Sequence, residues 1–525
     1  MYSGREDADN LVWDKNEEDE DRGLKRLRLK TFCRKVVGLV EERLGLPATL
    51  IPPLIPGSYN VHYRIRQEGT SPDLLVRLPR PAALVFPEHK TLHEAAAASL
   101  VASCTQLPIP RQLCYAQESP VGPFIIMEWV ENKGTISRRL ARPDEDPLAA
   151  HVLDPDVTSE TLAALWLKVA HCLLEISHIA LPKIGSLLET SHGVYEVADR
   201  PISHNMNDMV ALANIPRSIL PQEGETYATA DEWYTALADM HIAQLVFQHN
   251  DVVESEADCR NKYVARQVFR RLAREGKLSI FGFADDKWSA QSAARRAKAA
   301  TELAPAPSGV DSFRLWGDDF RAGNILLNDS DEIAALVDWE FAYSAPTQFI
   351  LDPPWWLLLQ TIEWWSDGID SWVETYEERL GMWLAAMEQA ERDADDAPSA
   401  KQQVSHCLGA ERLPAPLSRY MRESWETGRF FLNYAARKSW AFDALYWRYL
   451  DERFFGKREE GTAKDDLWKT RIHLLSRKER EAMEGLVQQK MADMEDRRIV
   501  DWDPAEAKRR LGTFLLVKDP VSHRL

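Results

Sequence analysis

The sequence predicts a two-lobed α+β protein in which a small antiparallel-sheet lobe (50–131) precedes a large helical lobe (132–455). Two observations lead to this prediction. Short alternating apolar runs such as "NVHYRIR" and "LLVRL", separated by turn residues, are typical of strands. After about residue 157, apolar residues recur at helical spacing instead, as in "ETLAALWLKVAHCLLEISHIA" (160–180).

Residues 1–49 are predicted to form an acidic tail followed by a helix. The first 24 residues are polar and acidic, which is typical of a mobile segment. The stretch "LKRLRLKTFCRKVVGLVEERLG" (24–45) places apolar residues at helical spacing, and Gly45 is a suitable stop. Its Lys/Arg run is interpreted as the solvated face of this helix.

Within the sheet lobe, turns rich in Gly, Ser and Pro separate the expected strands. An alanine-rich helix, "EHKTLHEAAAASLVASCTQ" (88–106), interrupts them, and "PIPRQLCYA" and "GPFIIMEWVE" are the last two strands. Four histidines, His89, His93, His171 and His178, lie on or near apolar helices. They are interpreted as structural, without metal-ligand spacing.

In the helical lobe, residues 284–308 lose apolar periodicity and gain Ala, Ser and Pro, so we expect a mobile surface insertion there. Residues 456–525 are predicted to be a charged helical extension. The chain has 18 tryptophans, several of them clustered. Core packing is the favoured interpretation of these clusters, and an aromatic cage for a quaternary ammonium group is the alternative.

The composition excludes some classes of function. There are 64 Lys and Arg against 82 Asp and Glu, a formal charge of −18, and an acidic chain repels nucleic-acid backbones. No apolar run approaches the roughly 18 residues that would span a membrane. Six scattered cysteines form no C-x-x-C pair, so we expect neither a disulfide framework nor a zinc site, and a cytoplasmic location. The oligomeric state is left open.

The stretch "FRLWGDDFRAGNILLNDSDEIAALVDWEFAY" (313–343) carries the candidate chemistry. Asn324 opens one short apolar run and Asp338 ends the next, so an antiparallel hairpin would bring them side by side. Asp319 would overhang them from the preceding loop. Amide and carboxylate oxygens suit Mg²⁺ with bound phosphates, and a nearby free carboxylate can accept a proton from an attacking hydroxyl.

These motifs resemble the aminoglycoside phosphotransferase and choline kinase-like family, within the protein-kinase-like fold, and most of all its fungal-type members. The resemblance covers roughly residues 50–455. It implies transfer of the γ-phosphate of ATP, with Mg²⁺, to a hydroxyl of a small-molecule acceptor. The stretches that carry it are "GSYN" (57–60), "LPKIGSL" (181–187), "NDVVESEADCRNKYVARQVFR" (250–270), "FRLWGDDFRAGNILL" (313–327), "VDWEFAYSAPTQFILDPPWWLLL" (337–359) and "SWETGRFFLNYAAR" (424–437).

The resemblance implies a role for individual residues. Asp319 would be the catalytic base, and Asn324 and Asp338 would hold Mg²⁺. Asp352 would brace the catalytic loop through hydrogen bonds, with a helix N-cap before Pro353 as the alternative. On the nucleotide side the implied residues are Arg77 and its helix partner Glu94, the phosphate turn Gly57, Ser58 and Tyr59, and the adenine hinge Met127, Glu128 and Trp129.

Three departures from the family pattern keep a second interpretation open. Gly317, Asp318 and Asp319 stand where the family has H-G-D, Arg77 replaces a lysine, and the phosphate turn has one glycine. Two adjacent carboxylates resist joint ionisation, so one of them is expected to hold a proton tightly. The alternative is a pseudokinase that binds a nucleotide or metabolite. A third interpretation is an interaction scaffold that uses the charged C-terminal helices. The sequence does not identify the acceptor of the phosphate.

Overall fold

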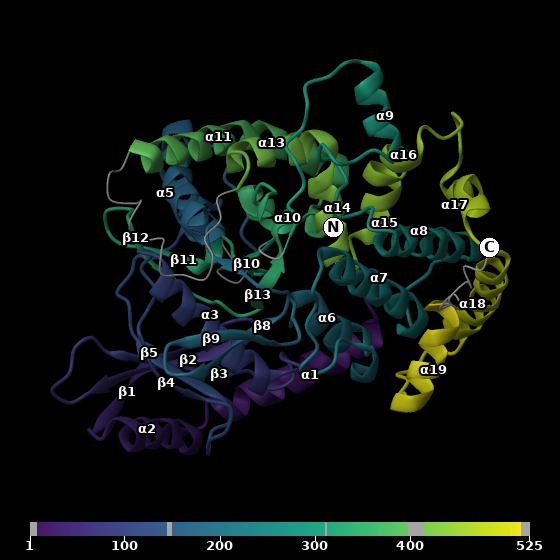
Figure 1. Cartoon of the computed structure of the whole chain (residues 1–525). Coiled ribbons are helices and arrows are strands. Elements are labelled where there is room, and N and C mark those ends of the chain that lie inside the picture. The colour runs from purple at the N-terminus through teal and green to yellow at the C-terminus, as the bar shows by residue number, and fades with distance from the viewer. Residues whose placement is uncertain (1–7, 144–149, 310–311, 397–412, 516–525) are drawn as a thin grey trace.

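A computed structural model describes residues 8–143, 150–309, 312–396 and 413–515. A five-stranded sheet with two flanking helices forms one lobe, and helices dominate the rest of the molecule (Figure 1). This arrangement confirms the predicted two-lobed α+β architecture.

All neighbouring strands of the sheet lobe are antiparallel, in the order β1-β2-β3-β5-β4. Helix α2 covers one face, because its apolar side chains share a core with Val61, Tyr63 and Ile65 of β2. Helix α3 lies between the sheet and the helical lobe. The elements of this lobe are α2 (Lys30–Leu44), β1 (Ala48–Pro56), β2 (Asn60–Gln67), β3 (Leu74–Pro79), α3 (Pro87–Cys104), β4 (Gln112–Ala116) and β5 (Phe124–Glu128).

In the helical lobe, α5 packs along α11 and α7 packs along α8. Buried tryptophans such as Trp166, Trp233, Trp372 and Trp383 fill its core, as the packing interpretation predicts. Its first half contains β6 (Gly134–Thr135), α4 (Ile136–Leu140), α5 (Ser159–Ser177), β7 (Ala180–Leu181), β8 (Ser186–Ser191), β9 (Val194–Asp199), α6 (His204–Ala213), α7 (Ala230–Phe247), α8 (Glu256–Arg274) and α9 (Ala290–Ala297).

The second half of the chain begins with the strands of the candidate site and continues through helices to residue 515. These elements are β10 (Phe313–Gly317), β11 (Ile325–Leu327), β12 (Ile333–Leu336), β13 (Ala342–Pro346), α10 (Thr347–Ile350), α11 (Gly368–Asp396), α13 (Leu417–Thr427), α14 (Arg429–Arg437), α15 (Phe442–Leu445), α16 (Asp451–Phe455), α17 (Leu467–Arg471), α18 (Arg477–Glu495) and α19 (Pro504–Leu515).

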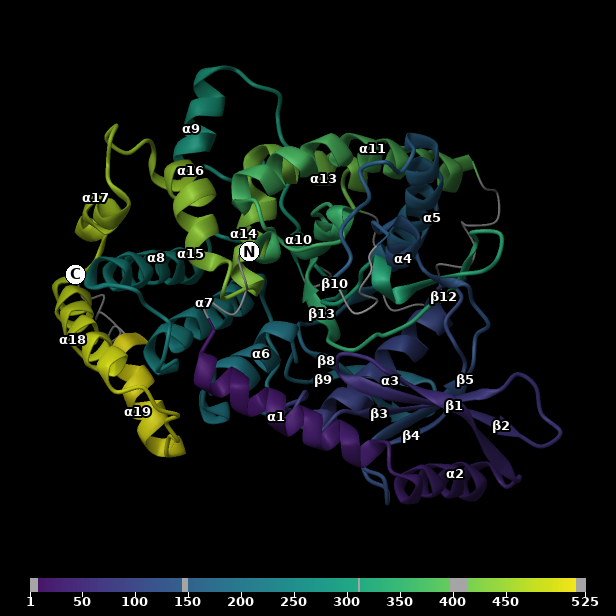
Figure 2. The same ribbon diagram turned by 180° about the vertical axis from the view of Figure 1, so that it is seen from behind.

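The acidic N-terminus is ordered from residue 8 onward, so the expectation of a mobile tail over residues 1–24 is wrong there. Helix α1 (Asn10–Leu27) runs from the helical lobe to the sheet lobe (Figure 2). The Asp9 carboxylate caps it and also accepts from the Asn250 side-chain amide at 2.8 and 2.9 Å. Asn250 lies 241 residues from Asp9, so local composition could not reveal this contact. Residues 1–7 lie outside the described residues.

Residues 284–308 lie at the surface and carry α9, but they are anchored at both ends. The buried Asp286 carboxylate accepts from the Ser289 hydroxyl at 2.7 Å and from the Gly282 amide at 3.1 Å. At the other end, the Ala304 amide donates to Glu423 at 2.9 Å. The two ends of the segment are therefore fixed, and the expectation that it is a mobile insertion stays a prediction.

The charged C-terminal extension is docked on the helical lobe, where α18 packs on α8. Asp451 of α16 is fully buried and accepts from Arg471 Nε at 2.8 Å and from Arg458 Nη1 at 2.7 Å. In addition, the buried Lys490 ammonium donates to the Gln248 carbonyl at 2.7 Å. Part of the charge of the extension is therefore used for internal pairing.

Among the described residues, no helix combines the length and apolarity needed to cross a membrane. Cys33, Cys114, Cys172 and Cys259 are free thiols, whereas Cys104 is disulfide-bonded. Disulfides are rare in the cytoplasmic location expected from the sequence, so the bonded Cys104 departs from that expectation.

We predict that Asp451→Ala lowers the free energy of unfolding by about 3–5 kcal/mol, because it leaves buried arginines without their anion. The matched control is Asp370→Ala. Asp370 also binds an arginine, Arg448, but both side chains are more than half exposed, so its loss should be worth less than about 1 kcal/mol. Denaturant titration of the two variants checks this. Equal effects would show that Asp451 does not anchor the extension.

Candidate active site

The predicted hairpin is present and brings Asn324 and Asp338 together. Strands β11 and β12 pair antiparallel, with Ile325 opposite Leu336, and the Val337 amide donates to the Asn324 carbonyl at 2.9 Å. Asp338, which comes two residues after the end of β12, therefore lies beside Asn324, which immediately precedes β11. It has a left-handed backbone (φ 64°), a strained conformation that often occurs at functional sites.

Asp319 overhangs this pair from the loop after β10. The Asn324 side-chain amide donates to the Asp319 carbonyl at 2.8 Å and to its carboxylate Oδ2 at 3.1 Å. Arg321 Nε donates to the other carboxylate oxygen at 3.0 Å. Carboxylate oxygens of Asp319, Asp338 and Glu340 lie within 4.8 Å of one another. This set of hard oxygen donors fits Mg²⁺.

Arg77 of β3 is buried and binds carboxylates from both lobes. Its Nε lies 2.9 Å from Glu94 of α3, which is the pair implied by the family pattern. Its Nη2 contacts Asp338 closely and lies 3.2 Å from Glu340. Burial would lower the pKa of the guanidinium, but these carboxylates outweigh it and raise the pKa. Arg77 is therefore a permanent cation held between the lobes.

A second buried cation, Lys90, was missed in the sequence. It lies one turn before Glu94 on α3, and its Nζ is 2.9 Å from that carboxylate and in close contact with Glu340. Asn60 accepts from Lys90 at 3.1 Å and donates to Glu340 at 2.9 Å. The four-residue spacing of Lys90 and Glu94 on one helix could have predicted their ion pair. The contact of Lys90 with Glu340 could not be predicted, because the two residues are far apart in the sequence.

The phosphate turn between β1 and β2 is held by backbone and arginine contacts. The Gly57 amide donates to the Asn60 carbonyl at 2.8 Å. Arg80 Nη1 donates to the carbonyls of Gly57 and Ser58 at 2.9 and 3.0 Å. Tyr59 reaches across to the helical lobe, where its hydroxyl is hydrogen-bonded to His204 Nε2 at 2.7 Å. The turn is therefore connected to the helical lobe by a hydrogen bond.

His62, another residue that sequence reasoning missed, connects this turn to Arg77. Its Nδ1 lies 3.1 Å from the Ile55 carbonyl and its Nε2 lies 3.4 Å from Arg77 Nη1. Burial, with help from the Arg77 charge, lowers the pKa of His62 to about 3. The ring is therefore neutral, so Nδ1 donates to Ile55 and Nε2 can accept from Arg77.

Asp318 has its own set of partners, which differ from those of Asp319. It is buried and accepts from the His204 amide at 2.9 Å and from the Trp316 indole at 3.0 Å. Burial would raise the pKa of Asp318, but Lys438 and Arg437 outweigh it and lower the pKa. The expected tightly held proton is therefore not on Asp318, because nearby cations stabilise the ionised form.

His204, the first residue of α6, contributes to the support that the missing H-G-D histidine would give. Its amide holds Asp318, and its ring joins Tyr59 to Asp208, which lies 2.9 Å from Nδ1. Burial opposes the charge, but Asp208 outweighs it and raises the pKa of His204. Residues 204 and 318 are 114 positions apart and share no local motif, so this contact was not predictable from the sequence.

Asp352 is buried, but its hydrogen bonds differ from those expected. It accepts from the Ser424 hydroxyl at 2.6 Å and from the Asn433 amide at 3.0 and 3.1 Å. These partners lie on α13 and α14, so Asp352 ties helices together rather than bracing the loop 317–324 directly. The N-cap alternative also fails, since Pro354 holds the N-cap position of the following turn.

Of the predicted hinge residues, Met127 and Glu128 end β5 and Trp129 follows it. The amides of Glu128 and Trp129 are engaged, donating to the carbonyls of Arg111 and Asp73 at 2.9 and 2.8 Å. The amides of Glu128 and Trp129 are therefore occupied by hydrogen bonds within the protein.

A cavity of about 660 Å³ lies between the lobes. Its described lining includes the phosphate turn together with Asp319, Asn324 and Asp338, whereas Arg77, Glu94 and the hinge are not part of it. Away from these residues the wall is aromatic and acidic. The aromatic and acidic residues there are Trp13, Trp355, Trp364, Trp440, Asp208 and Glu363, and Lys438 adds a positive charge to the same wall.

No family model and no curated protein matches the chain. Among solved structures, an aminoglycoside phosphotransferase in a ternary complex with AMP-PNP and hygromycin B is 12% identical, with 77% of this chain and 98% of that chain covered and a TM-score of 0.35. A macrolide 2′-phosphotransferase type I is 15% identical (81% and 96% covered, TM-score 0.32). A spectinomycin phosphotransferase in complex with ADP and spectinomycin is 11% identical (89% and 98% covered, TM-score 0.28).

These structures are small-molecule phosphotransferases, the group that the sequence motifs resemble. The expectation of a fungal-type member stays a prediction.

Asp352 should make stability depend on pH between about 4 and 6. Burial outweighs its hydrogen bonds and raises its pKa from 3.8 to about 6. The folded state therefore binds the extra proton, and this contribution is complete below pH 4 and lost as pH rises through 6. Two pKa units correspond to roughly 3 kcal/mol. Unfolding curves of wild type and Asp352→Asn should differ by this pH-dependent component, and parallel curves would refute it.

Proposed function

We propose that this protein transfers the γ-phosphate of ATP, with Mg²⁺, to a hydroxyl of a small molecule. The observation that supports this most is the convergence of Asp319, Asn324 and Asp338 on one cavity, beside the Arg77–Glu94 pair. Each of these residues fulfils a requirement of phosphoryl transfer.

Asp319 is the proposed base. Arg321 and Asn324 fix the orientation of its carboxylate, which is 14% exposed. In the transfer, the acceptor hydroxyl gives its proton to Asp319, its oxygen bonds to the γ-phosphorus, and the bond from that phosphorus to the bridging oxygen of ADP breaks. Asn324, Asp338 and Glu340 would hold Mg²⁺, which supplies neutralisation of phosphate charge when bound.

The buried charges on the nucleotide side are compatible with this ligand. Arg77 and Lys90 face the carboxylates of Glu94, Asp338 and Glu340, which leaves one net negative charge in this group. A divalent cation would compensate that charge and the phosphates. The amides of Ser58 and Tyr59 are the proposed phosphate donors, and the carbonyls of Met127, Glu128 and Trp129 are the proposed adenine contacts.

Arg77 is also the observation that favours a second candidate, a nucleotide- or metabolite-binding pseudokinase. The guanidinium already holds three carboxylates, one of which is the proposed metal ligand Asp338. A protein in which this pairing persists would bind its ligand without transferring a phosphate. Nucleotide binding and turnover separate the two candidates.

Asp338→Asn should weaken ATP binding in the presence of Mg²⁺ at least about tenfold, because it removes a charge from the metal ligands and keeps the shape. Calorimetry with Mg²⁺ and with EDTA measures this, and the EDTA affinity should change less than about twofold. Asp329→Asn, an exposed change on the turn of the same hairpin, is the control. Equal affinities of Asp338→Asn and wild type in Mg²⁺ would remove Asp338 from the site.

Asp319→Ala should reduce transfer of labelled phosphate to a panel of polyhydroxylated small molecules by about 10²–10⁴-fold while ATP binding persists. Asp318→Asn should instead lower the melting temperature and keep turnover per folded molecule. The reason is that Asp318 stabilises its loop through hydrogen bonds with the His204 amide and the Trp316 indole. The reverse pattern would exchange the two assignments. ATP binding by wild type without transfer to any acceptor or to water would favour the pseudokinase.

A further inference from the structure

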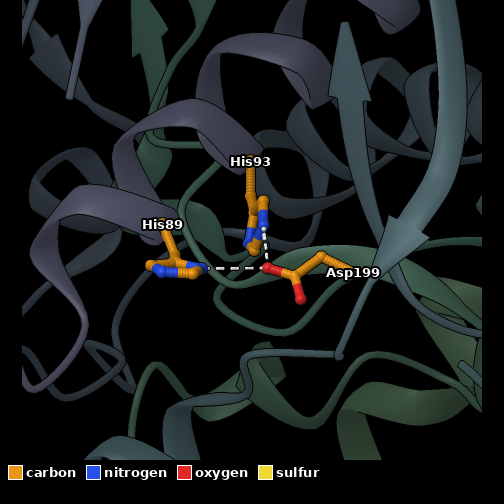
Figure 3. Close-up of side chains that lie close together, drawn as sticks. All are labelled: His89, His93 and Asp199. Carbon is orange, nitrogen blue, oxygen red and sulfur yellow. Dashed lines mark hydrogen bonds and ion pairs between the residues drawn. The ribbon is translucent and has the colours of Figure 1, made fainter. Parts of the chain in front are cut away.

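Two histidines of α3 and one aspartate meet outside the cavity of the candidate active site. His89 Nδ1 and His93 Nε2 each lie 3.0 Å from the same oxygen, Oδ2 of Asp199, at the end of β9 (Figure 3). The rings stand nearly perpendicular, at 80°, so each directs one nitrogen toward the carboxylate. The four-residue spacing places both histidines on one helix face, which the structural interpretation of them overlooked.

Two backbone amides fix the orientation of the Asp199 carboxylate. Its other oxygen, Oδ1, accepts from the Arg200 amide at 2.8 Å and from the Gly224 amide at 2.7 Å. These two donors leave Oδ2 directed at the histidines. Such outer hydrogen bonds are what orients a ligating carboxylate in metal sites.

We propose that His89, His93 and Asp199 form a binding site for Zn²⁺. Two imidazole nitrogens and one carboxylate oxygen are a donor set that zinc accepts, and the three candidate atoms lie within 4.8 Å of one another. Ligands at about 2.0–2.2 Å in a tetrahedron are roughly 3.3–3.5 Å apart, so an outward shift of a few tenths of an ångström would accommodate the ion.

The site is reached from solvent on the His89 side. His93 and Asp199 are buried, whereas the His89 side chain is 29% exposed. Glu223, which is largely exposed, lies 3.8 Å from the outer nitrogen of His89 and marks the solvent side. Water fills the fourth position in this proposal. The absence of cysteine ligands explains why the cysteine pattern, on which the expectation of no zinc site was based, could not detect it.

The position of the site indicates a structural role for the ion. His89 and Lys90 are neighbours on α3, and so are His93 and Glu94. The histidines face β9 of the helical lobe, whereas Lys90 and Glu94 face Glu340 and Arg77. A zinc ion would therefore fix α3 to β9 and hold the buried charges of the cleft in register.

The test is zinc binding by the full chain after treatment with a chelator. Wild type should take up one Zn²⁺ per chain with micromolar or tighter affinity, measured by calorimetry and metal analysis. Co²⁺ should give the intense visible absorption of a four- or five-coordinate site. His89→Gln, a change at the most exposed ligand, should weaken Zn²⁺ binding at least about 100-fold.

Two controls separate this site from others. His192→Gln removes a fully exposed histidine from the turn between β8 and β9 and should leave zinc binding intact. Asp338→Asn alters the candidate Mg²⁺ ligands and should also leave it intact. Asp199→Asn should behave as His89→Gln does. Absence of zinc uptake by wild type, or full uptake by His89→Gln, would overturn the proposal and show a plain hydrogen-bonded His–Asp–His cluster.

Discussion

The arrangement of the two lobes depends on a group of buried charges between them. Arg77 and Lys90 of the sheet lobe share the carboxylates of Glu94, Asp338 and Glu340, and all except Asp338 are almost fully buried. A buried charge without a partner is very unfavourable, so each member restricts the positions of the others. Strand β3, helix α3 and the segment after β12 must therefore keep one relative placement. This placement determines where Asn324 and Asp319 lie with respect to the phosphate turn.

The loop that carries Asp318 and Asp319 is supported by contacts with distant residues. A glycine stands at residue 317 in place of a histidine, and Asp318 turns inward to the Trp316 indole and the His204 amide. The ring of His204 then contacts Tyr59 of the phosphate turn. The loop and the turn are thus joined through α6, so that loss of the local histidine does not leave the loop unsupported.

Local patterns predicted much of this molecule, and contacts between distant residues account for what they missed. The hairpin that joins Asn324 and Asp338 was predictable because apolar runs and a turn determine it within 15 residues. The Arg77–Glu94 pair followed from the family pattern. By contrast, the docking of α1 depends on Asn250, and the partners of Asp352 are on α13 and α14. No periodicity or spacing encodes such pairs. The aspartate that meets His89 and His93 is likewise more than 100 residues away.

The same contacts constrain how a nucleotide could enter. The sheet lobe is held to the rest of the chain by Arg77 at the cleft, by Tyr59 at His204, and by Arg80, which binds Glu20 of α1 while it holds the phosphate turn. In each of these contacts a group of the proposed nucleotide site is already paired within the protein. Phosphates and a divalent cation would therefore bind by exchange, replacing Asp338 as a partner of Arg77 and Arg77 as a partner of Asp338. The divalent cation would bring two positive charges to Asp338 where the guanidinium brings one, and the phosphates would bring more negative charge to Arg77 than one carboxylate does. The attraction at both groups would therefore increase, while Glu94 of α3 keeps Arg77 in place.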